Sequence, residues 1–159
     1  MAEPRRAPAT ADAPAAGASV KLGVLADAVG YLLRRAQLAV FEDFARRFAA
    51  LDLTPAQFSS LVAIAENPGR RQSDIAAALG VQRPNFVALM DDLERRGLAE
   101  RVRSGEDRRA NALQLTPAGG ALLERARVAQ AEQEAAIRAS LGESERLRLI
   151  AALEKLSRL

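Results

Sequence analysis

The chain has 159 residues, of which 49% are apolar and 27% are charged, and its formal net charge is +3. This length suits one domain or one protomer of a small assembly. Cysteine and histidine are absent, which excludes disulfides, thiol redox sensing and histidine–metal ligation, and removes the usual general base near neutral pH. No isolated carboxylate pair takes its place, so we expect no enzyme activity, no metal and no cofactor. Charges interrupt every apolar stretch before it can span a bilayer, and we expect a cytoplasmic protein.

The first fifty residues divide into a tail and a helical segment. Residues 1–19 are rich in alanine and proline without an apolar period, which predicts a disordered tail. From about Val20 to Ala50 no proline or capping signal interrupts the pattern. The sequence therefore predicts one long helix over 20–50, because apolar residues recur every three or four positions, as at Leu25, Val29, Leu32, Ala36 and Val40.

A second helix has a clear start signal. Thr54 suits the N-cap, Pro55 the first helical position, and Gln57 completes a capping box. The stretch "ENPG" at 66–69 contains the residues that end helices. The predicted buried stripe of this helix consists of Phe58, Leu61, Val62 and Ala65.

Two further helices follow, separated by a short turn. The first is predicted over 72–79 and ends at Gly80; the second runs from about Gln82 to Arg96 and ends at Gly97. Two helices joined by a turn of a few residues with a glycine are typical of a helix-turn-helix.

Two short runs after Gly97 predict a β-hairpin. The runs are "LAERVR" (98–103) and "ANALQL" (110–115), and in the second Leu113 and Leu115 alternate with Ala112 and Gln114. Thr116 and Pro117 then repeat the cap-and-proline start of a helix that extends to about Ser140, and a last helix follows "LGES" at 141–144. A hairpin directly after a helix-turn-helix indicates a winged helix. The predicted fold class is mainly α, of α+β type.

At this point the chain resembles the MarR family of bacterial transcription regulators. "DIAAALGVQRPNFVALMDDLERRGLAER" is similar to the family's helix-turn-helix, and "DRRANALQLTPAG" to its wing signature. The resemblance implies a homodimer that binds double-stranded DNA at a roughly palindromic operator. It also implies a winged helix-turn-helix lobe over 51–116 and dimerisation helices over 20–50 and 117–159. The long apolar stripes of the terminal helices agree with this, since a lone protomer would expose them.

The recognition helix of such a lobe places its N-terminal residues at base edges in the major groove. Asparagine and glutamine side chains can read adenine, arginine can read guanine, and alanine can contact a thymine methyl group. The expected base-contacting residues are Gln82, Arg83, Pro84, Asn85 and Ala88. Asp91, Asp92 and Glu94 at the other end of this helix would repel phosphate, so we expect that end to face away from DNA.

Arginines elsewhere in the lobe suit phosphate and groove contacts, because their guanidinium groups bind phosphate bidentately. Arg70 and Arg71, before the preceding helix, are candidate phosphate contacts. In the wing, Arg109 matches the family's arginine and Arg108 its variable tip residue. An arginine on a narrow hairpin can enter the minor groove, and we expect Asp107 to orient the Arg109 side chain. The alternative is an ordinary solvated turn.

Relatives in this family are usually repressors released by small aromatic or anionic ligands. The first helix contains Tyr31, Arg34, Arg35, Leu38 and Phe41 within three turns, and an arginine pair beside aromatic residues can hold an anion. The stretch also resembles the branch of the family that senses hydroxycinnamoyl-coenzyme A thioesters, which implies an aromatic acyl-coenzyme A effector. The alternative is that these residues form a solvated helix face beside the apolar stripe used for dimerisation. A ligand-independent regulator and a winged-helix protein-interaction module also stay open.

Overall fold

The computed structural model describes residues 20–103 and 111–159. The described residues divide into two compact units, one that ends at residue 36 and one that begins at residue 37. The first holds a 3-10 helix (Gly23–Asp27) and the start of α1 (Val29–Phe48). The prediction of one continuous helix from residue 20 is wrong, because Ala28 is extended (φ −78°, ψ 117°) and Gly23 has a φ of +55°. Apolar spacing over so short a segment does not distinguish a 3-10 turn from an α-helix.

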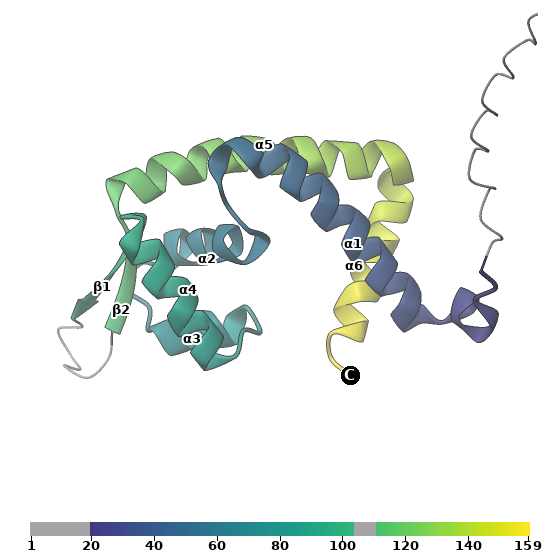
Figure 1. The fold of residues 1–159 in the computed structure, drawn as a ribbon, viewed down its shortest axis with the longest axis horizontal. Coiled ribbons are helices and arrows are strands. Elements are labelled where there is room, and N and C mark those ends of the chain that lie inside the picture. Colours follow the sequence, from purple (N-terminus) through teal and green to yellow (C-terminus); the bar gives the residue numbers. More distant parts are fainter. Residues whose placement is uncertain (1–19, 104–110) are drawn as a thin grey trace, which may run out of the picture. The chain divides into compact units, whose positions relative to one another are not determined.

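The second unit holds the rest of the chain in the predicted order. After α1, a 3-10 turn (Ala49–Leu51) leads to the remaining elements. In Figure 1, α2, α3 and α4 lie beside the β-hairpin, and α5 leads from the hairpin to α6. The predicted class, mainly α with a small antiparallel sheet, is confirmed. The bounds are α2 (Pro55–Glu66), α3 (Gln72–Ala78), α4 (Arg83–Arg95), β1 (Ala99–Arg103), β2 (Asn111–Leu115), α5 (Pro117–Leu141) and α6 (Glu143–Leu156).

The predicted start and stop signals act as expected. Thr54 Oγ1 accepts a hydrogen bond from the Gln57 backbone N–H at 3.2 Å, and the Gln57 side chain accepts one from the Thr54 N–H at 2.8 Å, which completes the capping box. Gly80 and Gly97 each adopt a φ of +65°, beyond the ends of α3 and α4. Because only glycine enters this backbone region at little cost, both positions end their helices.

The wing contains a third strand-like segment that the sequence did not indicate. β1 pairs antiparallel with β2, with Ala99 opposite Leu115. On the other edge of β2, the Leu113 N–H donates to Arg70 O and the Gly69 N–H donates to Leu113 O, both at 2.9 Å. Strand β2 is therefore flanked on both sides. Ala112 and Leu113 point to opposite faces of the strand and are both buried (4% and 0% exposed), so both faces of β2 are covered at this point.

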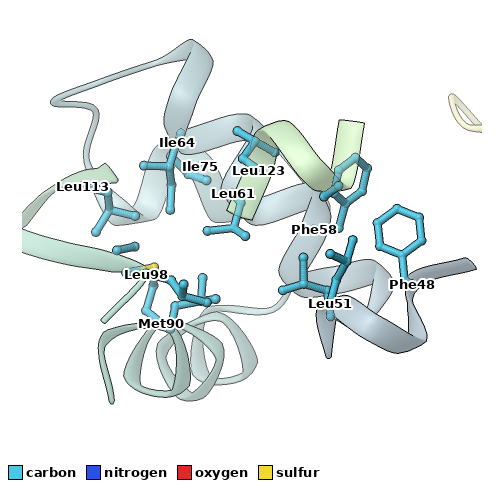
Figure 2. Packing of buried hydrophobic residues seen from close by; sticks show 14 of the residues in the cluster. Phe48, Leu51, Phe58, Leu61, Ile64, Ile75, Met90, Leu98, Leu113 and Leu123 are labelled. Atoms are coloured by element: carbon cyan, nitrogen blue, oxygen red, sulfur yellow. The ribbon is translucent and has the colours of Figure 1, made fainter. Parts of the chain in front are cut away.

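The core lies where α2 meets the other elements of the lobe. Figure 2 shows Leu61 and Ile64 of α2 with Met90 of α4, Leu113 of β2 and Leu123 of α5. Helix α2 contacts α3, α4, α5 and β2, so it is buried around most of its circumference.

Because α2 is packed on most sides, its buried residues extend beyond the single stripe that the sequence predicted. Phe58 and Leu61 are buried as predicted, Val62 and Ala65 are half-buried, and Ser60 and Ile64 are buried as well. The buried Ser60 hydroxyl donates to the Ala56 carbonyl oxygen at 2.8 Å.

Among the described residues no single helix is long and apolar enough to cross a membrane. One bent pair, Val29–Leu51 with Pro55–Glu66, passes that test by length and composition alone, with a 69° bend between its parts.

Candidate DNA interface and effector site

The start of α4 presents an exposed polar surface. Phe86, Met90 and Leu93 pack into the core, and the remaining side of the helix start faces outward. Gln82 occupies the N-cap without a side-chain cap hydrogen bond. Its amide is therefore not engaged in capping the helix. All five residues expected to contact bases are exposed: Gln82, Arg83, Pro84, Asn85 and Ala88.

The acidic residues of α4 are paired both within the helix and with other parts of the lobe. Asp92 accepts a hydrogen bond from Gln57 Nε2 of α2 at 2.6 Å and pairs with Arg95. Asp91 lies 2.8 Å from the Arg101 guanidinium of β1, and Glu94 accepts the Arg101 backbone N–H at 2.7 Å. Such pairing lowers the negative potential that this end would present to phosphate.

Sequence reasoning did not identify Arg101. Its partners lie on α3 and α4, 7 to 29 residues away in the chain, and these contacts depend on how the strand packs against the two helices. The only signal was an arginine in a predicted strand close to three acidic residues.

Arg70 and Arg71 are both exposed, beside β2. Backbone pairing of residues 69–71 with Ala112 and Leu113 holds them on the same sheet that carries the wing. Arg71 is the N-cap of α3 and makes no side-chain cap hydrogen bond, so an arginine occupies a position where serine or threonine is usual.

The predicted wing-tip residues Asp107, Arg108 and Arg109 lie outside the described residues. The strands that lead to the tip are described. Their register pairs Arg103 with Asn111, and Gln114 Nε2 donates to Glu100 Oε1 at 2.6 Å across the hairpin. This pairing fixes where the tip segment leaves and rejoins the sheet.

The five residues predicted to bind an effector all lie on α1. Tyr31 is half-buried, and Arg34 and Arg35 are exposed; these three belong to the first unit. Leu38 and Phe41 belong to the second unit and are 55% and 46% exposed. The apolar side chains are thus available to a ligand or to a partner chain.

A cavity of about 220 Å³ lies between α1 and α5 in the second unit. Its polar residues are Asp43, Gln133 and Ser140. Gln133 Nε2 donates to the Val40 carbonyl at 3.0 Å and to Asp43 Oδ2 at 3.3 Å. Asp43 also accepts the Arg47 Nε–H at 2.7 Å, and this hydrogen bond lowers the pKa of the Asp43 carboxyl. The sequence did not reveal the cavity, because its two walls are about 90 residues apart. Its lining is Ala39, Val40, Asp43, Gln133, Ala136, Ile137 and Ser140.

Helix α6 has no buried residue. Its large apolar side chains are each more than a third exposed, which is unusual for a helix of a stable monomer. They are Leu147, Leu149, Ile150, Leu153 and Leu156.

A helix-turn-helix followed by a paired hairpin, with a polar exposed start to the second helix, defines a winged helix-turn-helix protein. The family model described as "MarR family" matches residues 51–110. A protein described as a transcriptional regulator for the hcr operon of Thauera aromatica is 39% identical over 137 residues, which cover 86% of this chain and 82% of that protein. The chain belongs to the MarR family of transcription regulators.

Solved structures of the transcriptional repressor CouR are similar over nearly their whole length. CouR bound to a 23-mer DNA duplex is 47% identical with a TM-score of 0.84, covering 88% of this chain and 99% of that one. CouR bound to p-coumaroyl-CoA is 45% identical with a TM-score of 0.83, at the same coverage.

Proposed function

We propose that the protein is a homodimeric, cytoplasmic transcription repressor that binds a roughly palindromic operator in double-stranded DNA. The observation that carries this proposal is the exposed start of α4, where Arg83 and Asn85 face away from a core that holds Phe86 and Met90. These side chain types read guanine and adenine in the major groove. The likeness to CouR solved on a DNA duplex supports the same use of the surface.

The remaining DNA contacts come from the sheet of the wing. Arg70 and Arg71 are proposed to contact phosphates, because the backbone pairing of their segment with β2 holds them beside the hairpin. Arg109, oriented by Asp107 and aided by Arg108, is proposed to enter the minor groove. In this arrangement residues 51–116 form the DNA-binding lobe.

Dimerisation is assigned to residues 20–50 and 117–159. The exposed apolar side chains of α6 support this assignment, since a second copy would remove them from water. A two-fold symmetric dimer presents two recognition helices to two half-sites about one helical turn of DNA apart, roughly 34 Å.

We propose an aromatic acyl-coenzyme A thioester as the effector that releases the DNA. Arg34 and Arg35 supply the charge that phosphate groups require, with Tyr31, Leu38 and Phe41 as further contacts. The likeness to CouR bound to p-coumaroyl-CoA supports this class of ligand.

The α1–α5 cavity supports the acyl part of the proposal separately. Its volume of about 220 Å³ and its alanine, valine and isoleucine side chains suit an aromatic acyl group. Pockets that bury most of a drug-sized ligand measure roughly 300–1,000 Å³, so in this proposal the cavity takes the acyl group and the coenzyme A part lies outside it.

Gel-shift titration of promoter DNA with wild-type protein and with Arg109→Ala tests the DNA proposal. The variant is expected to bind about 1–3 kcal/mol more weakly and to lower the slope of log K against log salt by about 1. Unchanged affinity and slope would remove the wing from the interface. Absence of salt-dependent DNA binding by the wild type would favour the protein-interaction module.

Thermal-shift measurements test the effector proposal by comparing aromatic acids with their coenzyme A thioesters. The thioesters are expected to raise the melting temperature and to displace the operator DNA. Stabilisation by the free acids alone would contradict the assignment of a thioester, and Arg34→Ala with Arg35→Ala identifies the contribution of the arginine pair.

A further inference from the structure

Arg101 of β1 connects three elements of the DNA-binding lobe. Its Nε donates to Gln72 Oε1 at the start of α3 at 2.8 Å, and one terminal nitrogen donates to the Val87 carbonyl of α4 at 3.3 Å. The other terminal nitrogen pairs with Asp91 at 2.8 Å and with Glu94. Its side chain is only 18% exposed. The guanidinium therefore contacts α3 and α4 from the wing.

Two of these partners carry negative charge on the helix proposed to read DNA. Asp91 is 61% exposed and Glu94 is 32% exposed. Without a cation beside them, both carboxylates would repel the phosphate backbone, over distances comparable to the Debye length of about 8–10 Å at physiological salt. Arg101 places one positive charge between them.

The attachment also sets the position of α4 relative to the wing. Glu94 accepts both the backbone N–H and the guanidinium of Arg101, so strand and helix are joined at two points. Hydrogen bonds between charged groups are roughly twice as strong as neutral ones, and a planar guanidinium holds its partners in fixed directions. Recognition of a base edge needs that rigidity, because its hydrogen bonds require donor–acceptor distances near 3 Å.

We infer that Arg101 is a positioning residue for DNA recognition: it offsets the charge of Asp91 and Glu94 and holds α4 against the wing without touching DNA itself. This inference rests on the proposed function.

Operator affinity of Arg101→Met, measured at low and at high salt, tests the inference. The variant keeps the length of the aliphatic stem and loses the charge and the hydrogen bonds. It is expected to bind operator DNA about tenfold more weakly at low salt, because hydrogen bonds to charged groups are lost and two carboxylates lose their cation. The deficit is expected to shrink as salt rises, since salt screens the carboxylate–phosphate repulsion. A purely structural role would give a deficit independent of salt.

The triple variant Arg101→Met with Asp91→Asn and Glu94→Gln provides the decisive comparison. It removes the repelling charges together with the cation and is expected to recover much of the lost affinity. This comparison remains valid even if Arg101→Met folds poorly, because the triple variant replaces both carboxylates by neutral amides that need no cation. A triple variant that binds no better than Arg101→Met overturns the inference, as does an Arg101→Met variant that binds like the wild type.

Arg95→Met is the matched control for loss of an exposed arginine from the same helix. Arg95 lies at the end of α4 that is expected to face away from DNA, with its side chain 73% exposed, and pairs with Asp92. Asp92 keeps Arg96 at 4.0 Å and Gln57 Nε2 at 2.6 Å, so this loss leaves the carboxylate with partners. It is expected to change operator affinity less than twofold, within the small value of an exposed ion pair. Failure of the wild type itself to bind operator DNA would refute the proposed function. The inference on Arg101 is refuted only by the variants, while the wild type still binds, so the two failures can be distinguished.

Discussion

The backbone carbonyl oxygen of Leu98 occupies the space that a β-carbon on Gly119 would need. Leu98 lies just before β1 and Gly119 in the first turn of α5, so the base of the wing meets the helix that follows it. Thr116 completes this junction: its N–H donates to Leu98 O at 3.1 Å, its hydroxyl donates to Gly97 O at 2.6 Å, and its Oγ1 accepts the Gly119 N–H at 3.0 Å. Gly119 of the "LTPAG" stretch is therefore needed so that the first turn of α5 can lie against the Leu98 backbone.

Gly119→Ala is expected to lower the free energy of unfolding by about 1–3 kcal/mol, the usual cost of overpacking, because the Leu98 backbone must move. Urea denaturation measures this. Gly120→Ala is the matched control, since a β-carbon there meets nothing within 4 Å. That variant is expected to gain about 0.5–1 kcal/mol from alanine's better helix propensity. If both variants shift stability in the same direction, the contact does not constrain position 119.

Asp43 is expected to make stability depend on pH. The hydrogen bond from Arg47, with those from Arg46 and Gln133, lowers the pKa of its carboxyl below 3.8 in the folded protein. A carboxyl of this kind contributes stability that is fully present above its unfolded pKa and is lost as the pH falls through the folded pKa. Asp43→Asn should therefore be less stable than the wild type at neutral pH, and the difference should shrink below about pH 4.

Urea midpoints from pH 2.5 to pH 7, the acid range in which carboxyl groups titrate, measure this effect. Glu42→Gln is the control from the same helix, with a side chain that is 77% exposed and an ion pair to Arg46 at 3.4 Å. It is expected to change stability little at any pH. A deficit of Asp43→Asn that stays constant down to the lowest pH would contradict the role of the carboxylate charge.

Ile150→Glu and Leu153→Glu on α6 are expected to break the dimer, because a charge on an interface that excludes water costs several kcal/mol. Light scattering after size exclusion should give about twice the chain mass of 17.0 kDa for the wild type and the single-chain mass for the variants. Glu154→Lys, which changes charge on the same helix without altering its apolar side chains, should remain dimeric. Variants that keep the mass of the wild type would place the interface elsewhere.

Ala136→Phe is expected to fill the α1–α5 cavity and abolish release of operator DNA by an aromatic acyl-coenzyme A thioester. Binding of DNA in the absence of the thioester should persist, because Ala136 lies outside the proposed DNA-binding lobe. Ala135→Phe, one residue earlier on the same helix and not in the cavity lining, is the control and should respond like the wild type. Normal release from Ala136→Phe would exclude the cavity as the acyl site.

Local chemistry was enough to predict most element boundaries. Thr54 with Gln57, Thr116, Gly80 and Gly97 place helix ends to within about one residue, because caps and left-handed glycines act through backbone groups only a few residues away. The same short-range signals, in order, predicted the winged helix, and the resemblance to the family rested on the helix-turn-helix and wing motifs themselves. Apolar spacing was less decisive in α2, since a helix surrounded on most sides buries more than one stripe.

Only the tertiary structure revealed the contacts that join distant segments. The pairing of residues 69–71 with β2, the Arg101 cluster and the Asp43–Gln133 hydrogen bond connect positions roughly 7 to 90 residues apart. No periodicity in the chain encodes such distances, because they depend on how whole helices pack. Interactions a few residues long were enough to define α2 to α6 and the two strands of the hairpin, but not the 3-10 turn before α1 or the strand-like pairing of residues 69–71. Which charges meet depends on the packing of α3, α4 and β1, and so it follows only from the three-dimensional arrangement.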